Sequence, residues 1–240
     1  MRWPGRDASD IRSGTLKWRS HGGGQRGNLV APYGSIRAVT IGFGISYLAG
    51  FVLLAELLGS SADETAQFTR HFDNDASRFG DIAGAVALLA AALALVMAGL
   101  VLRHRLGAAQ PSLRVDLVAA LAVLAATGLL VSAGLLLAVP LWQSFGDITG
   151  DPGVEPGAAA GIAQAGTALL ICTLFILAAW TAIVAQLARK AGAIGRGLSI
   201  TGFLAAILAC LGITGAGAFP LGLWWIVVGM RWRQPGLPSR

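Results

Sequence analysis

The chain has 240 residues, of which 55% are hydrophobic and only 12% are charged, with a net charge of +6. Soluble domains carry about 25% charged residues, and the apolar residues here form blocks of about 20, the length that crosses a bilayer. This composition excludes a soluble domain. Because the basic residues lie beside the apolar blocks, they indicate membrane topology, and no nucleic-acid partner is expected.

Residues 1–35 are basic and glycine-rich, and they contain too few apolar residues to form a core. We predict a disordered cytoplasmic tail over residues 1–35. The tail is too long and polar for the start of a secretory signal, so the first apolar block is expected to be a retained helix. Residues 234–240 form a second predicted cytoplasmic tail.

The apolar blocks predict an all-α, polytopic transmembrane helix bundle with six spans. Pro220 suits the first turn of a new helix, after a run of turn-forming residues. Residues 197–230 are short for two spans, so both two full spans and a shallow hairpin remain open. The predicted spans cover residues 36–58, 82–102, 115–139, 160–188, 198–213 and 217–230.

The basic residues favour six spans with both termini in the cytoplasm. This topology leaves only Arg70 and Arg78 outside, as the preference of basic loops for the cytoplasm requires. Merging the last two helices would place Arg231 and Arg233 outside. We therefore reject five spans.

A polar stretch over residues 60–84 separates the first two spans. Within it, phenylalanines at helical intervals predict an outer amphipathic segment over residues 62–80. Arg78 and Asp81 are three residues apart at the start of span two and can pair there. We interpret this pair as a topology and packing device, with a ligand site as the alternative.

Few polar side chains occur within the spans. Glu56, near the outer end of span one, can reach the interface, which favours snorkelling over ion binding. Gln164 and Thr167 lie in the most polar span, where interhelical hydrogen bonding is the simpler role. The candidate ligand-binding residues are Glu56, Arg78, Asp81, Gln164 and Thr167.

Other residues predict anchoring and close packing. Trp224 and Trp225 are expected to anchor the last helix in the inner headgroup layer, and Trp142 is expected to do so outside. Cys172 and Cys210 are interpreted as small packing residues. Small residues four apart predict close helix approach; the pairs are Gly80 with Gly84, Gly128 with Ser132, and Gly157 with Gly161.

The sequence contains no phosphate loop, HExxH, CxxC or GxSxG motif. No histidine falls within a predicted span, so an intramembrane histidine relay is not supported. We therefore expect no catalytic residues, no metal and no cofactor.

Several short motifs resemble uncharacterised six-helix integral membrane proteins of high-GC actinobacteria. The resemblance rests on the segment from Arg78 to Gly84, the Arg103–His104–Arg105 turn, the segment from Gly195 to Phe203, and Phe219–Pro220–Leu221. It covers most of residues 36–233 and implies a multi-pass protein of the bacterial plasma membrane. The group has no activity to carry over.

The expected function is therefore non-catalytic: binding of a lipid, a small apolar ligand or a protein partner. The partners expected are the lipid bilayer and a second copy or another membrane protein. The alternative is a small-molecule or ion transporter that uses the outer residues and the polar residues of span four.

Overall fold

The computed structural model describes residues 34–55, 71, 74–109, 112–149, 155–211 and 217–233. Residues 1–33 of the first predicted tail, the second predicted tail, Glu56 and most of the predicted amphipathic segment 62–80 lie outside the described residues, and helix α1 already begins at Gly34. Six helices make up nearly all of the described part, which contains no strand: α1 (Gly34–Leu53), α4 (Asp75–Ala109), α5 (Leu113–Thr149), α6 (Pro156–Lys190), α7 (Arg196–Leu211) and α8 (Ala218–Arg231).

Four of the helices, α1, α4, α5 and α6, are long and apolar enough to cross a membrane. This confirms the all-helical class and supports a membrane protein. Helices α7 and α8 have 16 and 14 residues, or about 24 and 21 Å at 1.5 Å per residue. Both are shorter than the roughly 30 Å hydrocarbon core of a bilayer.

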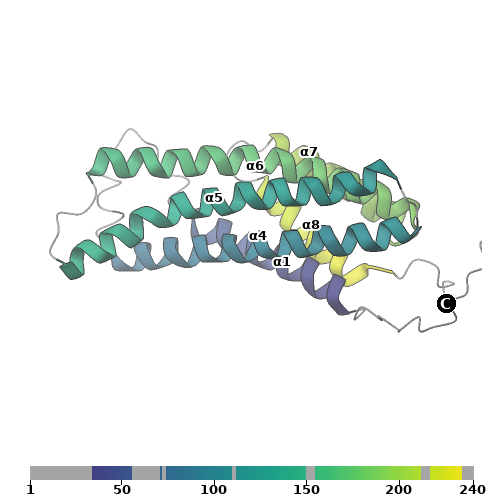
Figure 1. The fold of residues 1–240 in the computed structure, drawn as a ribbon, viewed down its shortest axis with the longest axis horizontal. Coiled ribbons are helices and arrows are strands. Elements are labelled where there is room, and N and C mark those ends of the chain that lie inside the picture. Colours follow the sequence, from purple (N-terminus) through teal and green to yellow (C-terminus); the bar gives the residue numbers. More distant parts are fainter. Residues whose placement is uncertain are drawn as a thin grey trace, which may run out of the picture. The chain divides into compact units, whose positions relative to one another are not determined.

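Helices that follow one another in sequence pack side by side, and α8 packs against α1, so the six helices form a ring. Figure 1 shows α7 and α8 alongside one half of the long helices α4, α5 and α6. The short helices are antiparallel, because the Trp224 indole of α8 hydrogen-bonds to Leu198 near the start of α7, while Gly217 lies against Ala209.

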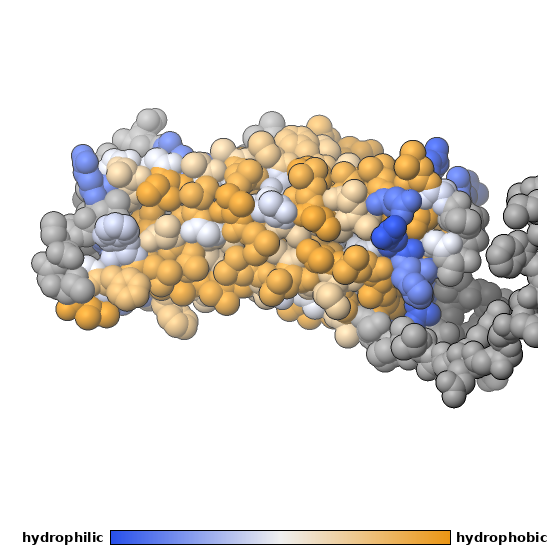
Figure 2. Space-filling view, viewed as in Figure 1, coloured by the Kyte–Doolittle hydropathy of each residue, from blue (hydrophilic) through white to orange (hydrophobic). Residues whose placement is uncertain are grey.

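The helices extend beyond the predicted spans. Helix α4 begins at Asp75 and α5 continues through Pro140 to Thr149. Hydropathy locates the section of a helix that lies in lipid. The helix itself can continue into the membrane interface, where its polar side chains are solvated. Figure 2 shows the result, an apolar surface between two hydrophilic ends.

Two of the predicted small-residue contacts occur. A side chain added at Gly128 of α5 would collide with Thr173 of α6, and Ser132 donates a 2.6 Å hydrogen bond to the Gly166 carbonyl. A Cβ at Gly84 would lie 2.8 Å from Leu54, just after α1, and 3.0 Å from Leu53 at its end. Gly157 and Gly161, by contrast, have no neighbour within 4 Å of an added Cβ, so the third pair makes no close contact.

An aromatic cluster joins α1, α6 and α8 in the core. The Trp180 and Trp225 rings stack with centroids 4.3 Å apart, and Phe43 meets both edge-on. The indole nitrogens also bond to neighbouring helices: Trp180 donates to Val118 of α5, and Trp225 donates to the Thr181 hydroxyl. Buried tryptophans in such a cluster combine large apolar area with a satisfied N–H group.

The burial of individual side chains corrects two predictions. Trp224 and Trp225 are 4% and 1% exposed, so they are core residues of the bundle and not headgroup anchors. Trp142 on α5 is 61% exposed, as expected of an anchor. Cys172 and Cys210, predicted to pack inside, are exposed on the surface of their helices.

Candidate functional site

The predicted outer residues make two side-chain contacts at the start of α4. The Asp81 carboxylate is buried, and its Oδ2 lies 2.8 Å from Nε2 of His71. The Arg78 guanidinium contacts the exposed carboxylate of Asp75. The pairing of Asp81 with Arg78 stays a prediction, and His71 was not predicted as a partner of Asp81.

The polar residues of α6 do not gather into one site. Gln164 is exposed, while the half-buried Thr167 donates to the Ala163 carbonyl of its own helix. Thr173 likewise donates to Leu169, and Thr181 accepts from Trp225. Of these bonds only that between Trp225 and Thr181 joins two helices, because Thr167 and Thr173 bond to carbonyls of α6 itself.

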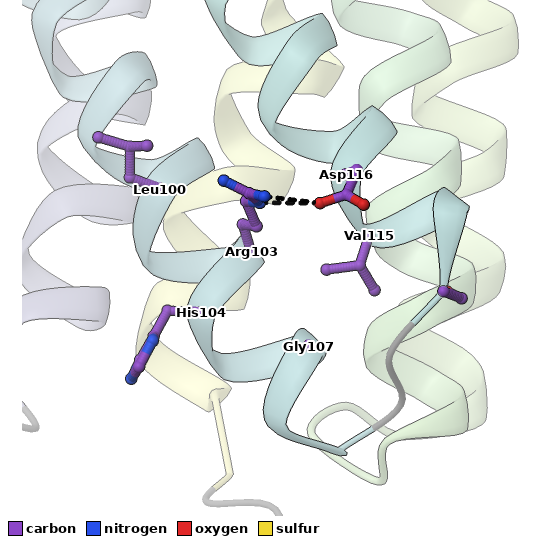
Figure 3. Close-up of a pocket in the computed structure, with 7 residues that line it drawn as sticks. Leu100, Arg103, His104, Gly107, Val115 and Asp116 are labelled. Atoms are coloured by element: carbon purple, nitrogen blue, oxygen red, sulfur yellow. Dashed lines mark hydrogen bonds and ion pairs between the residues drawn. The ribbon is translucent and has the colours of Figure 1, made fainter. Parts of the chain in front are cut away.

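A polar pocket of about 490 Å³ lies between the end of α4 and the start of α5. Figure 3 shows Arg103 and Asp116 pointing toward one another across it, and His104 pointing away. The guanidinium of Arg103 lies 2.9 Å from the Asp116 carboxylate. The ion pair neutralises both charges, so this pocket offers little attraction to a charged ligand.

The larger feature is an apolar groove of about 600 Å³ between α7 and α8, here called the α7–α8 groove. Its α7 side extends from Gly197 to Leu208, roughly 16 Å along the helix. The lining residues are Gly197, Leu198, Thr201, Leu204, Ala205 and Leu208 of α7 and Pro220, Leu223, Trp224, Val227 and Arg231 of α8.

Local packing determines the shape of the groove. The Trp224 indole donates a 2.8 Å hydrogen bond to Leu198 and so joins α8 to α7 beneath the groove. Gly202 allows this approach, because a Cβ there would lie 2.7 Å from the Trp224 ring. Leu204 and Leu223 are 53% and 56% exposed, so the walls of the groove face outward from the bundle.

One end of the groove is strongly basic. Arg231 lines it directly, and α6 ends at this side of the hairpin with Arg189 and Lys190. The backbone N–H of Arg233 donates to Ala193 in the turn between α6 and α7. We call the end of the bundle formed by Arg189, Lys190, Arg196, Arg231 and Arg233 the basic end.

The sequence analysis did not predict the groove, because it treated α7 and α8 as membrane spans and did not consider the space between their side chains. Pro220 and the short helix lengths were the available signals. Among the residues that the structure describes, no cluster of His, Cys, Asp and Glu is arranged to hold a metal ion.

Comparisons with protein-family models, curated proteins and solved structures find no match to this chain. The resemblance to uncharacterised six-helix membrane proteins therefore remains a prediction.

Proposed function

We propose that this chain is a non-catalytic, multi-pass protein of the bacterial plasma membrane that holds a phospholipid acyl chain in the α7–α8 groove. The groove itself is the observation that supports the proposal: about 600 Å³ lined almost wholly by apolar side chains. Its outward-facing leucines lie at membrane depth if α7 and α8 insert beside the long helices.

A hollow at that depth needs an apolar occupant. Water gains no hydrogen bonds from leucine side chains, and an empty groove would lose the dispersion contacts of its walls. A linear hydrocarbon chain suits a groove roughly 16 Å long between two helices, and phospholipid is the molecule present at the highest concentration around such a protein.

The proposed topology has six membrane-inserted helices and both termini in the cytoplasm. Four long helices and a returning α7–α8 hairpin are consistent with it, because a hairpin that enters and leaves on one side keeps the basic end in the cytoplasm whether or not it crosses fully. The lengths of α7 and α8 favour the shallow alternative.

Native mass spectrometry of the full chain, purified in mild detergent, tests lipid binding. Leu204→Trp fills the groove, whereas Ile207→Trp adds the same bulk to the same helix outside it. The two positions are equally exposed, at 53% and 54%, and only Leu204 lines the groove. We expect wild type and Ile207→Trp to retain phospholipid and Leu204→Trp to lose most of it.

Equal lipid retention by all three proteins would contradict the proposal. A mass equal to two chains without lipid would also contradict the proposal, since a second copy of the chain would then occupy the groove. The measured mass separates these outcomes directly.

Transport is the second candidate, and the buried Asp81 carboxylate paired with His71 favours it, because buried acids in membrane proteins often belong to ion pathways. Proteoliposomes containing a pH-sensitive dye would test proton flux. Flux that Asp81→Asn abolishes would support this candidate, and the absence of flux in wild type, or flux that Asp81→Asn leaves unchanged, would contradict it.

A further inference from the structure

The C-terminal part of the chain has an unbalanced positive charge. No aspartate or glutamate occurs after Glu155 anywhere in the sequence. The basic end nevertheless presents exposed side chains at Arg189, Lys190, Arg196, Arg231 and Arg233. None of these five side chains forms an ion pair with a carboxylate of the described residues, so this end of the bundle attracts anionic groups.

Arg231 differs from the other arginines in its surroundings. It is exposed in the last turn of α8 and is the one charged residue among the described residues that line the groove. No carboxylate in the described part of the chain lies within ion-pairing distance of it. Arg103, by comparison, is neutralised by Asp116, and Arg37 donates to the Trp232 carbonyl.

We infer that the α7–α8 groove selects anionic phospholipids, with the acyl chain between the leucines and the headgroup phosphate on the Arg231 guanidinium. This inference rests on the proposed function and adds the chemical class of the lipid. Arginine stays charged at every physiological pH and presents several N–H donors in a plane, the arrangement that binds phosphate oxygens in pairs.

The lipid headgroup decides the strength of the interaction. A zwitterionic headgroup brings its own cation next to Arg231, whereas phosphatidylglycerol brings only the phosphate charge. One basic side chain near the membrane surface contributes enough attraction for an anionic lipid to raise affinity about fivefold.

The test is a lipid titration of the full chain followed by native mass spectrometry, using phosphatidylglycerol and phosphatidylcholine with identical acyl chains. Wild type should bind phosphatidylglycerol about fivefold more tightly. Arg231→Gln should remove most of that preference, because it weakens phosphatidylglycerol binding more than phosphatidylcholine binding. Arg233→Gln removes the same charge from the same end but outside the groove, and should keep the preference.

Two results would overturn the inference: Arg231→Gln that keeps the wild-type preference, or Arg233→Gln that loses as much of it. The groove-filling variant Leu204→Trp distinguishes failure of headgroup selection by Arg231 from failure of lipid binding in the groove. If it loses both lipids while Arg231→Gln keeps the preference, the groove binds lipid but Arg231 does not select it. If Leu204→Trp binds both lipids as wild type does, the proposed function fails.

Discussion

The two sides of the α7–α8 hairpin are built from similar apolar residues but are packed in opposite ways. The side facing the bundle is filled: Trp225 stacks on Trp180, and Trp224 is buried against Gly202. The outward side contains the groove, and Leu204 and Leu223 line it. In a membrane protein the hydrophobic effect does not drive helices together, so close packing and hydrogen bonds must hold the hairpin in place. The filled side provides them, and the outward side is left available for lipid.

Removing the central aromatic contact should have the largest effect on this arrangement. Trp225→Ala deletes the ring that stacks on Trp180 and the hydrogen bond to Thr181. A buried tryptophan replaced by alanine costs about 3–5 kcal/mol. Unfolding in mixed detergent micelles, followed by circular dichroism, should show this loss, together with loss of retained lipid. Trp142→Ala, at an exposed position, is the control, and a loss no greater than its own would contradict the role given to Trp225.

A smaller loss is expected where α7 meets Trp224. In Gly202→Ala the new Cβ would lie 2.7 Å from the Trp224 ring and 3.0 Å from Ala185, so the hairpin must shift. Overpacking of this kind costs about 1–3 kcal/mol. Gly197→Ala, on the same helix, has no neighbour within 4 Å and should be neutral or stabilising. Similar unfolding free energies for the two variants would contradict the close packing of Gly202 against Trp224 and Ala185.

The hydrogen bond beneath the groove should contribute less again. Trp224→Phe keeps most of the apolar ring and removes the donor to the Leu198 carbonyl. Interhelical hydrogen bonds in membranes average about 0.6 kcal/mol. The same unfolding experiment should therefore show a loss of about that size. A loss as large as that of Trp225→Ala would contradict the small contribution given to this hydrogen bond.

No loss of stability is expected at Tyr47, which packs against Phe43 in the aromatic cluster. Its hydroxyl is buried with no hydrogen-bond partner among the described residues. Because a buried hydroxyl without a partner costs free energy, Tyr47→Phe should leave stability unchanged or raise it by about 1 kcal/mol. A clear loss of stability would indicate that a bound water or ligand satisfies the hydroxyl.

The positions of the helices could be predicted from the sequence, and their surroundings could not. Apolar blocks locate each span because hydrophobic length is a local property. The role of Trp225 is not local: tryptophan suits both a headgroup layer and a crowded core, and only the path of α6 places Trp180 against it. The same holds for Asp81, whose partner His71 lies ten residues earlier, before the start of α4.

The groove illustrates this difference most clearly. Leu204 and Ile207 have the same chemistry, lie on the same helix and are equally exposed. Only Leu204 lines the groove, because α8 passes beside it at a distance that depends on Gly202 and Trp224. No pattern in the sequence of α7 alone distinguishes the two residues.

Mapping where lipid contacts the protein tests the central claim most directly. The full chain would be reconstituted with a phospholipid that carries a photoactivatable group in its acyl chain, crosslinked and digested, and the modified residues would be identified by mass spectrometry. Lipid binding in the groove predicts crosslinks concentrated on groove residues such as Leu204, Leu208 and Leu223, and depleted there in Leu204→Trp. Crosslinks spread evenly over the other exposed apolar residues, including Leu93, Leu130 and Val131, would contradict it.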